Sequence, residues 1–213
     1  MSIRMKFFCL LWSINLLGAA QAAPNILVFG DSLSAAYGIP VEAGWVALLA
    51  HRLQPGLQPT YQVINASVSG ETTAGGLTRL PKLLAAHRPF LTIVELGAND
   101  GLRGLPLTQS ARNLESMINL VQKQGGKVLL VGMQLPPNYG TAYASKFQTI
   151  FTDLAKKKKV RLVPFLFAGI ASQPGKFQAD GLHPTAQAQT ALLDNVWREL
   201  KPMLPAQPLG LKQ

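Results

Sequence analysis

Short apolar runs alternate along this chain with longer stretches of helical period, and this alternation limits its folds more than any other feature. The apolar runs cover residues 25–29, 61–66, 90–96, 127–133 and 160–163. Strands that are separated by helix-length connections pair in parallel, and the helices then cover both faces of the sheet. We therefore predict one three-layer α/β domain with a doubly wound, mainly parallel five-stranded sheet.

The segments between these runs carry the apolar stripes that covering helices need. Apolar residues recur with the spacing i, i+3, i+4, i+7 in two sets, Leu114, Met117, Ile118 and Val121, and Leu193, Val196, Trp197 and Leu200. The unbroken apolar run from Val128 to Val131 is typical of a central strand that is buried on both faces. We also predict a helix over residues 72–87, although Gly75, Gly76 and Pro81 lower its helix propensity.

The first residues have the three-part layout of an export signal. Basic Arg4 and Lys6 precede an apolar run over residues 7–17, and small residues around Ala22 follow it. The apolar run is shorter than the about 20 residues that span a membrane, so a cleaved signal is favoured over a retained anchor. We predict a signal peptide over residues 1–22, a folded domain over 23–201 and a flexible tail over 202–213. The protein would then be exported, either periplasmic or secreted.

Cysteine content and charge restrict the chemistry further. The single cysteine, Cys9, falls in the predicted signal, so the mature chain would hold neither a disulfide nor a thiolate metal site. The formal net charge is +10, which favours weak electrostatic contact with an anionic membrane surface but no specific nucleic acid. The sharpest basic cluster, Lys156 to Lys159, is interpreted as the solvated end of a helix. We expect a monomer.

Polar motifs follow the first three predicted strands, and another precedes the last predicted helix. They are Gly-Asp-Ser-Leu at residues 30–33, Ser-Gly-Glu at 69–71, Gly-Ala-Asn-Asp at 97–100 and Asp-Gly-Leu-His-Pro at 180–184. Ligands of open parallel sheets bind beyond the carboxyl ends of the strands. The motifs are therefore expected to meet at that edge of the sheet.

Together the four motifs resemble the SGNH or GDSL hydrolases, whose name records Ser, Gly, Asn and His in four separated blocks. The corresponding residues here are Ser32, Gly70, Asn99 and His183. The resemblance covers nearly the whole predicted domain and is closest to small periplasmic enzymes known as thioesterase I, lysophospholipase or arylesterase. It implies the flavodoxin-like SGNH hydrolase fold and a serine esterase that forms an acyl-enzyme without a cofactor or a metal. Its substrates would be small acyl esters, thioesters or lysolipids.

The residue types fit the roles that this resemblance implies. A serine hydroxyl becomes a good nucleophile when an imidazole accepts its proton, so Ser32 and His183 would act together, with Asp180 orienting the imidazole. The oxyanion would be bound by the backbone N–H groups of Ser32 and Gly70 and by the side-chain amide of Asn99. Metal-dependent hydrolysis is disfavoured because the sequence lacks a His-Glu-x-x-His motif.

Each of these residues also has a purely structural alternative. Ser32 could cap a helix or turn, Gly70 and Asn99 could be turn formers, and His183 could simply start a helix. Asp31 is expected to hydrogen-bond its local turn rather than to act as the triad acid. The other histidines, His51 and His87, are interpreted as surface or helix-end residues, and the carboxylates of Glu95 and Asp100 are left without a role.

Substrate contacts are expected from two loops, residues 97–105 and 135–143, which by resemblance flank an acyl groove. The candidates are Leu102, Leu105, Leu135 and Pro136, and the alternative is that they pack on the core. Two other functions stay open. One is a carbohydrate acetylesterase of the same superfamily, and the other is a non-catalytic protein that binds lipid or polyanions.

Overall fold

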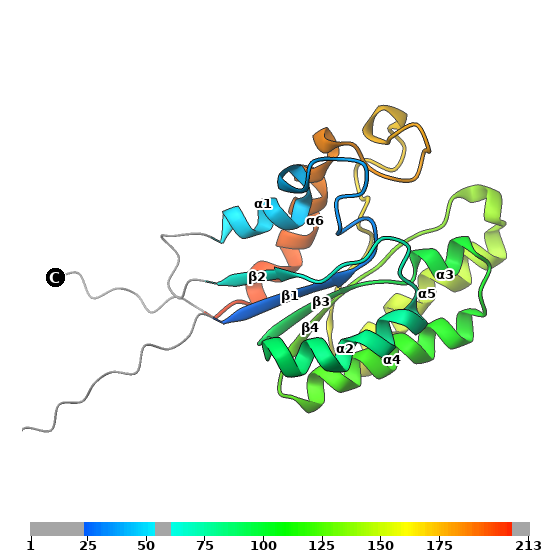
Figure 1. The fold of residues 1–213 in the computed structure, drawn as a ribbon. Coiled ribbons are helices and arrows are strands. Elements are labelled where there is room, and N and C mark those ends of the chain that lie inside the picture. Colours follow the sequence, from blue (N-terminus) through cyan, green and yellow to red (C-terminus); the bar gives the residue numbers. More distant parts are fainter. Residues whose placement is uncertain (1–23, 54–60, 206–213) are drawn as a thin grey trace, which may run out of the picture.

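Five strands form a single parallel sheet in the order β2-β1-β3-β4-β5 (Figure 1). The structure is a computed structural model, and it describes residues 24–53 and 61–205. The strands span Asn25–Gly30 (β1), Gln62–Asn65 (β2), Leu91–Glu95 (β3), Lys127–Val131 (β4) and Arg161–Val163 (β5). The predicted five-stranded sheet is confirmed, and all of its pairings are parallel.

Helices cover both faces of this sheet and make the three layers that the sequence predicts. On one face α1 packs against α6, and on the other α2, α4 and α5 lie side by side (Figure 1). The short helix α3 follows β3 directly. The helices span Trp45–Arg52 (α1), Thr73–His87 (α2), Ala98–Leu102 (α3), Leu107–Lys123 (α4), Thr141–Lys158 (α5) and Gln189–Leu200 (α6).

The core lies between the helices and the sheet, where the predicted apolar stripes point. All four residues of the α4 stripe are buried, as are three of the four in α6. The exception is Trp197, which is half-buried and packs under the guanidinium of Arg52 at 5.5 Å from the ring centroid. The side chains of β4 from Val128 to Val131 are buried, as expected for a strand with neighbours on both sides and helices on both faces.

Helix α2 forms despite its two glycines and its internal proline. Thr72 caps its N-terminus by accepting a hydrogen bond from the backbone N–H of Gly75. Gly76 faces the sheet so closely that an added Cβ would lie 2.6 Å from Leu96 Cδ1 and 3.2 Å from Phe29 Cε1. Gly76 lowers the helix propensity of α2, but a residue without a Cβ is what lets α2 pack this closely against β1 and β3. Pro81 lies inside the helix without ending it.

The strand order places a topological switch point between β1 and β3. These two strands are neighbours in the sheet, but the chain leaves them towards opposite faces, to α1 after β1 and to α4 after β3. Crevices at such points are where ligands bind in parallel sheets. Pairing of Gly30 with Glu95 at the carboxyl end brings the segments that follow both strands together.

Both predicted chain ends reach beyond the described residues. The predicted signal peptide, residues 1–22, lies wholly outside them. Of the predicted tail, residues 202–205 are described, and there Met203 and Leu204 pack against the core. Within the described ranges, none of the helices combines the length and the apolar character that crossing a membrane requires.

Candidate active site

Ser32 lies in the tight turn that follows β1, at the carboxyl edge of the sheet. The carboxylate of Asp31 accepts a hydrogen bond from the backbone N–H of Leu33 at 3.0 Å, so it closes the local turn as predicted. The Asp31 carbonyl accepts from the N–H of Ala35 at 3.0 Å and the Ser32 carbonyl from Tyr37 at 3.1 Å. These bonds hold the Ser32 backbone still, while its side chain borders an open cavity.

His183 and Asp180 meet Ser32, although His183 lies 151 positions from it in the sequence. Ser32 Oγ lies 2.9 Å from His183 Nε2, and His183 Nδ1 lies 2.6 Å from Asp180 Oδ2. The turn between the acid and the histidine depends on Gly181, whose φ of +67° is in the left-handed region that favours glycine. The three predicted residues therefore form one continuous hydrogen-bonded chain with the geometry of a nucleophile, a base and an orienting acid.

The Asp180 carboxylate is held in its ionised form by the same turn. Its Oδ1 accepts hydrogen bonds from the backbone N–H groups of His183, at 3.0 Å, and Leu182, at 2.9 Å. These bonds, that from the His183 backbone first, lower the pKa of Asp180 from 3.8 to about 2 against the opposing effect of burial. A charged acid beside Nδ1 favours the tautomer in which Nε2 is free to accept the serine proton.

Asn99 reaches the same edge from the start of α3, and its partner there is Asp31. Asn99 Nδ2 donates a hydrogen bond to Asp31 Oδ2 at 3.0 Å. An amide nitrogen carries two hydrogens, so one remains available for a ligand after the other is donated. The sequence did not indicate this contact, since it joins two residues that lie 68 positions apart.

A second carboxyl group lies directly behind the nucleophile turn. Glu95 is fully buried at the end of β3, where its Oε2 accepts from Ser34 Oγ at 2.7 Å and from the Asp31 N–H at 3.3 Å. Burial, with the neighbouring Asp31 carboxylate next, raises the pKa of Glu95 well above its ordinary range. Burial also raises the pKa of Asp31 from 3.8 to about 6. The pair of carboxyl groups of Glu95 and Asp31 therefore readily keeps one proton.

Gly70 lies in the loop after β2 with a φ of +78°, which glycine adopts without strain. Its carbonyl accepts a hydrogen bond from Arg103 Nη2 at 3.0 Å. Among the described residues, neither the backbone N–H of Gly70 nor that of Ser32 donates to another protein group. Two backbone donors are thus unengaged at this edge.

Asp100, left without a role at the sequence level, ties together the helices around the site. Its carboxylate accepts from the backbone N–H of Thr73 at 2.8 Å, from Thr73 Oγ1 at 2.6 Å and from Ser110 Oγ at 3.0 Å. Asn113 Nδ2 in turn donates to Thr73 Oγ1 at 3.0 Å. This buried network joins α2, α3 and α4, and so fixes the segment that carries Asn99.

A cavity of about 880 Å³ opens beside Ser32 and His183. Three of the four predicted contact residues line it, Leu102, Leu135 and Pro136. Leu105 is not part of its wall; it follows α3 and is 37% exposed. The other apolar lining residues, which sequence reasoning missed, include Met133, Phe165, Phe167 and Phe177.

These aromatic residues had a detectable signal, because Phe165 and Phe167 follow β5 at the edge where the other motifs were found. The segment after β5 carries no polar motif of the kind that follows β1, β2 and β3, so no role was expected for it. The remaining histidines lie away from the site, with His51 exposed in α1 and His87 at the end of α2, as predicted. No group of three or more potential metal ligands occurs within the described ranges.

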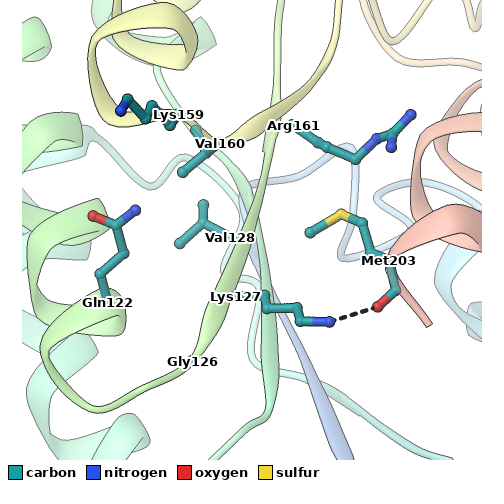
Figure 2. Close-up of a pocket in the computed structure, with 8 residues that line it drawn as sticks. All are labelled: Gln122, Gly126, Lys127, Val128, Lys159, Val160, Arg161 and Met203. Carbon is teal, nitrogen blue, oxygen red and sulfur yellow. Dashed lines mark hydrogen bonds between the residues drawn. The ribbon is translucent and has the colours of Figure 1, made fainter. Parts of the chain in front are cut away.

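A smaller hollow of about 300 Å³ lies at the opposite edge, by the amino ends of β4 and β5 (Figure 2). Lys127 donates to the Met203 carbonyl at 3.0 Å, and Arg161 pairs with Glu199. Figure 2 shows the Lys159 and Arg161 side chains pointing away from each other and out of the hollow. Because its cations diverge, this hollow is not organised around an anion.

Comparison with known proteins finds relatives over nearly the whole chain. Residues 28–191 match the model of the GDSL-like lipase/acylhydrolase family. The chain is 50% identical to Esterase TesA of Pseudomonas aeruginosa over 193 residues, which cover 90% of this chain and 95% of that esterase. It is 44% identical to an arylesterase of Vibrio mimicus, covering 91% and 94%. It is 40% identical to the thioesterase 1/protease 1/lysophospholipase L1 of Escherichia coli, covering 87% of each.

Solved structures agree with the sequence comparison. The crystal structure of TesA superposes with a TM-score of 0.81 at 51% sequence identity, and the alignment covers 84% of this chain and 99% of that one.

Proposed function

Because this chain belongs to the GDSL-like lipase/acylhydrolase family, we propose that it hydrolyses esters and thioesters with apolar acyl chains through an acyl-enzyme on Ser32. The observation that carries this proposal is the continuous chain from Ser32 Oγ through His183 to Asp180, with contacts of 2.9 and 2.6 Å. A serine that caps a turn needs no imidazole at hydrogen-bonding distance, nor a carboxylate behind that imidazole. The arrangement therefore favours nucleophilic catalysis over the structural alternative.

The reaction would proceed through acylation and then deacylation, and His183 gives back each proton that it accepts. His183 Nε2 takes the proton from Ser32 Oγ as the oxygen attacks the carbonyl carbon, and the imidazolium is stabilised by Asp180. When the tetrahedral intermediate collapses, the bond to the leaving oxygen or sulfur breaks and His183 gives that atom its proton. Water then attacks the acyl-enzyme with His183 again acting as base, and the carboxylic acid leaves while Ser32 regains its hydrogen.

The oxyanion would be bound by three neutral donors. The Ser32 and Gly70 N–H groups are free for this purpose, and Asn99 has one amide hydrogen left after its bond to Asp31. Donors that are already oriented need no reorganisation as charge develops, and each contributes about 3 to 4 kcal/mol to transition-state stabilisation.

The cavity supports an acyl chain as the bound group. Its volume of about 880 Å³ lies within the range of small-molecule sites, and apolar side chains, with leucine, phenylalanine, proline, alanine and methionine among them, supply most of its wall. A carbohydrate acetylesterase would need only a small acyl pocket and polar partners for sugar hydroxyls. On this basis we favour acyl esters over acetylated sugars.

Covalent labelling tests the proposal. An alkyl fluorophosphonate should add one phosphonyl group to Ser32, detectable by mass spectrometry, and Ser32→Ala should abolish the labelling. Ser69→Ala, which removes an exposed serine from the same edge, is the matched control and should label fully. A wild-type protein that stays unlabelled would instead favour the non-catalytic lipid or polyanion binder.

We also propose that the mature enzyme is exported and acts as a monomer. The signal-like pattern of residues 1–22 supports export. Ser32, Asn99, Asp180 and His183 all come from one chain, so the proposed chemistry requires no second copy.

A further inference from the structure

Tyr37 lies against the ring of His183 without lining the cavity. Its ring centroid is 4.5 Å from that of His183, with the two planes tilted by 40°. Tyr37 is nevertheless 53% exposed and does not belong to the cavity wall. The imidazole is therefore in contact both with the apolar cavity and with a solvent-exposed aromatic ring.

The backbone of Tyr37 is held in place although its side chain is exposed. Its N–H donates to the Ser32 carbonyl at 3.1 Å, and its carbonyl accepts from Gln178 Nε2 at 2.8 Å. The next residue, Gly38, has a φ of +73°, and an added Cβ there would collide with the Gln178 side chain. Contacts with Ser32 and with Gln178 thus fix the backbone that carries this aromatic ring, which lowers the entropy cost of a ligand binding to it.

The proposed reaction determines where a leaving group must lie. The leaving oxygen or sulfur receives its proton from His183 Nε2, so that atom must come within hydrogen-bonding distance of the imidazole. The acyl chain and the leaving atom are different substituents of the carbonyl carbon, so with the acyl chain in the cavity the leaving substituent extends away from it. Outside the cavity wall, the exposed ring of Tyr37 is the aromatic surface that packs against the imidazole.

We propose that Tyr37 is a specificity-determining residue that binds the aromatic ring of an aryl leaving group. This inference rests on the proposed function and adds to it a residue that would favour aryl over alkyl leaving groups. An aromatic ring stacks on an exposed tyrosine face, and such pairs contribute beyond their buried area. A flexible, charged glycerophospho group offers no face to stack and gains less from the same contact.

Ring packing on His183 alone would also explain the position of Tyr37, so the test must separate binding of the leaving group from positioning of the base. Positioning acts on every substrate equally, because each one uses the same imidazole. Recognition acts only on a leaving group that has a ring. The two roles therefore differ in the ratio of kcat/KM between an aryl ester and a non-aryl ester with the same acyl chain.

Phenyl butyrate and hexafluoroisopropyl butyrate make such a pair, since their leaving groups have similar acidity but only one is aromatic. Tyr37→Leu should lower kcat/KM for the phenyl ester by about three- to tenfold and leave that for the fluoroalkyl ester within about twofold. Tyr37→Phe keeps the ring and should retain the phenyl preference. Val41→Ala, at a 62% exposed apolar residue of the same loop, is the matched control and should change neither rate.

Equal losses on both esters would overturn the proposal in favour of a positioning role, and unchanged rates on both would overturn it outright. Phosphonate labelling of each variant distinguishes these outcomes from failure of the proposed function. A labelled Tyr37→Leu protein with an unchanged ester ratio refutes only the leaving-group assignment, whereas an unlabelled wild type refutes both.

Discussion

Replacing Asp31 by asparagine should make the protein more stable at neutral pH and less active. The carboxylate is 1% exposed, and burial is the main cause that raises its pKa from 3.8 to about 6. At neutral pH the folded protein therefore carries a buried charge that the unfolded chain would hold in water. Asparagine has nearly the same shape and removes that charge.

The magnitude follows from the shift in pKa. A difference of about two units corresponds to about 3 kcal/mol, because each unit is worth about 1.4 kcal/mol. Since the folded pKa is the higher one, protonation of Asp31 stabilises the fold fully below 3.8, and this stabilisation is lost as the pH rises through about 6. Asparagine does not ionise, so the variant keeps this stabilisation as the pH rises. The variant also weakens the hydrogen bond from Asn99, at a cost of about 1 to 2 kcal/mol, so the net gain at pH 7 should be about 1 kcal/mol.

Urea unfolding followed by tryptophan fluorescence measures this effect. The free energy of unfolding of Asp31→Asn minus that of the wild type should grow by about 2 to 3 kcal/mol between about pH 4 and pH 7. Asp153→Asn, which removes an exposed carboxylate, is the control and should show no comparable trend. A difference that stays constant over this range would refute the assignment of a buried, shifted carboxyl to Asp31.

The same substitution should lower turnover. An asparagine at position 31 can present its NH₂ group to Asn99. The Asn99 side chain would then turn its oxygen towards position 31, and its amide hydrogens would point away from the oxyanion. The expected loss in kcat is roughly tenfold to a hundredfold, less than for complete removal of an oxyanion donor. A gain in stability together with a loss of turnover is expected where an active site keeps a destabilising buried charge because catalysis needs it.

Two further predictions concern neighbouring residues. Asn99→Ala should lower kcat by about a hundredfold to a thousandfold while lowering the free energy of unfolding by only about 1 kcal/mol, and an unchanged kcat would remove Asn99 from the oxyanion site. Gly30→Ala should lower the free energy of unfolding by about 1 to 3 kcal/mol, because its Cβ would lie 2.5 Å from Glu95 Oε2 and 2.7 Å from Ser34 Oγ. Gly175→Ala, whose Cβ would meet nothing within 4 Å, is the control, and equal urea midpoints for the two variants would contradict the packing argument.

Much of the fold was predictable because its signals are local and repeated. Strands such as β4 are continuous apolar runs, and the stripe from Leu114 to Val121 has the helical period that one buried face requires. The meeting of Ser32 with His183 was predictable for a different reason. Parallel strands end at one edge of the sheet, and the helices that run back along it begin there, so motifs after strands and the motif before the last helix converge at that edge.

Contacts inside the site were harder to predict, since they depend on distances between segments. Leu105 has the same residue type as Leu102, but Leu102 ends α3 and lines the cavity, whereas Leu105 follows the helix and is exposed. Phe165 and Phe167 carry no motif at all, and they line the cavity only because β5 ends beside β4.

The linear sequence determined the layer architecture, the edge at which chemistry occurs and the residues that would perform it, because periodicity and residue type act over a few neighbours. Only the tertiary structure decided which groups modify that chemistry. The bond between Asp31 and Asn99, the burial of Glu95 and the ring of Tyr37 against His183 each join separate segments. Their effects depend on burial and on ångström-scale separation, and neither quantity exists until the chain has folded.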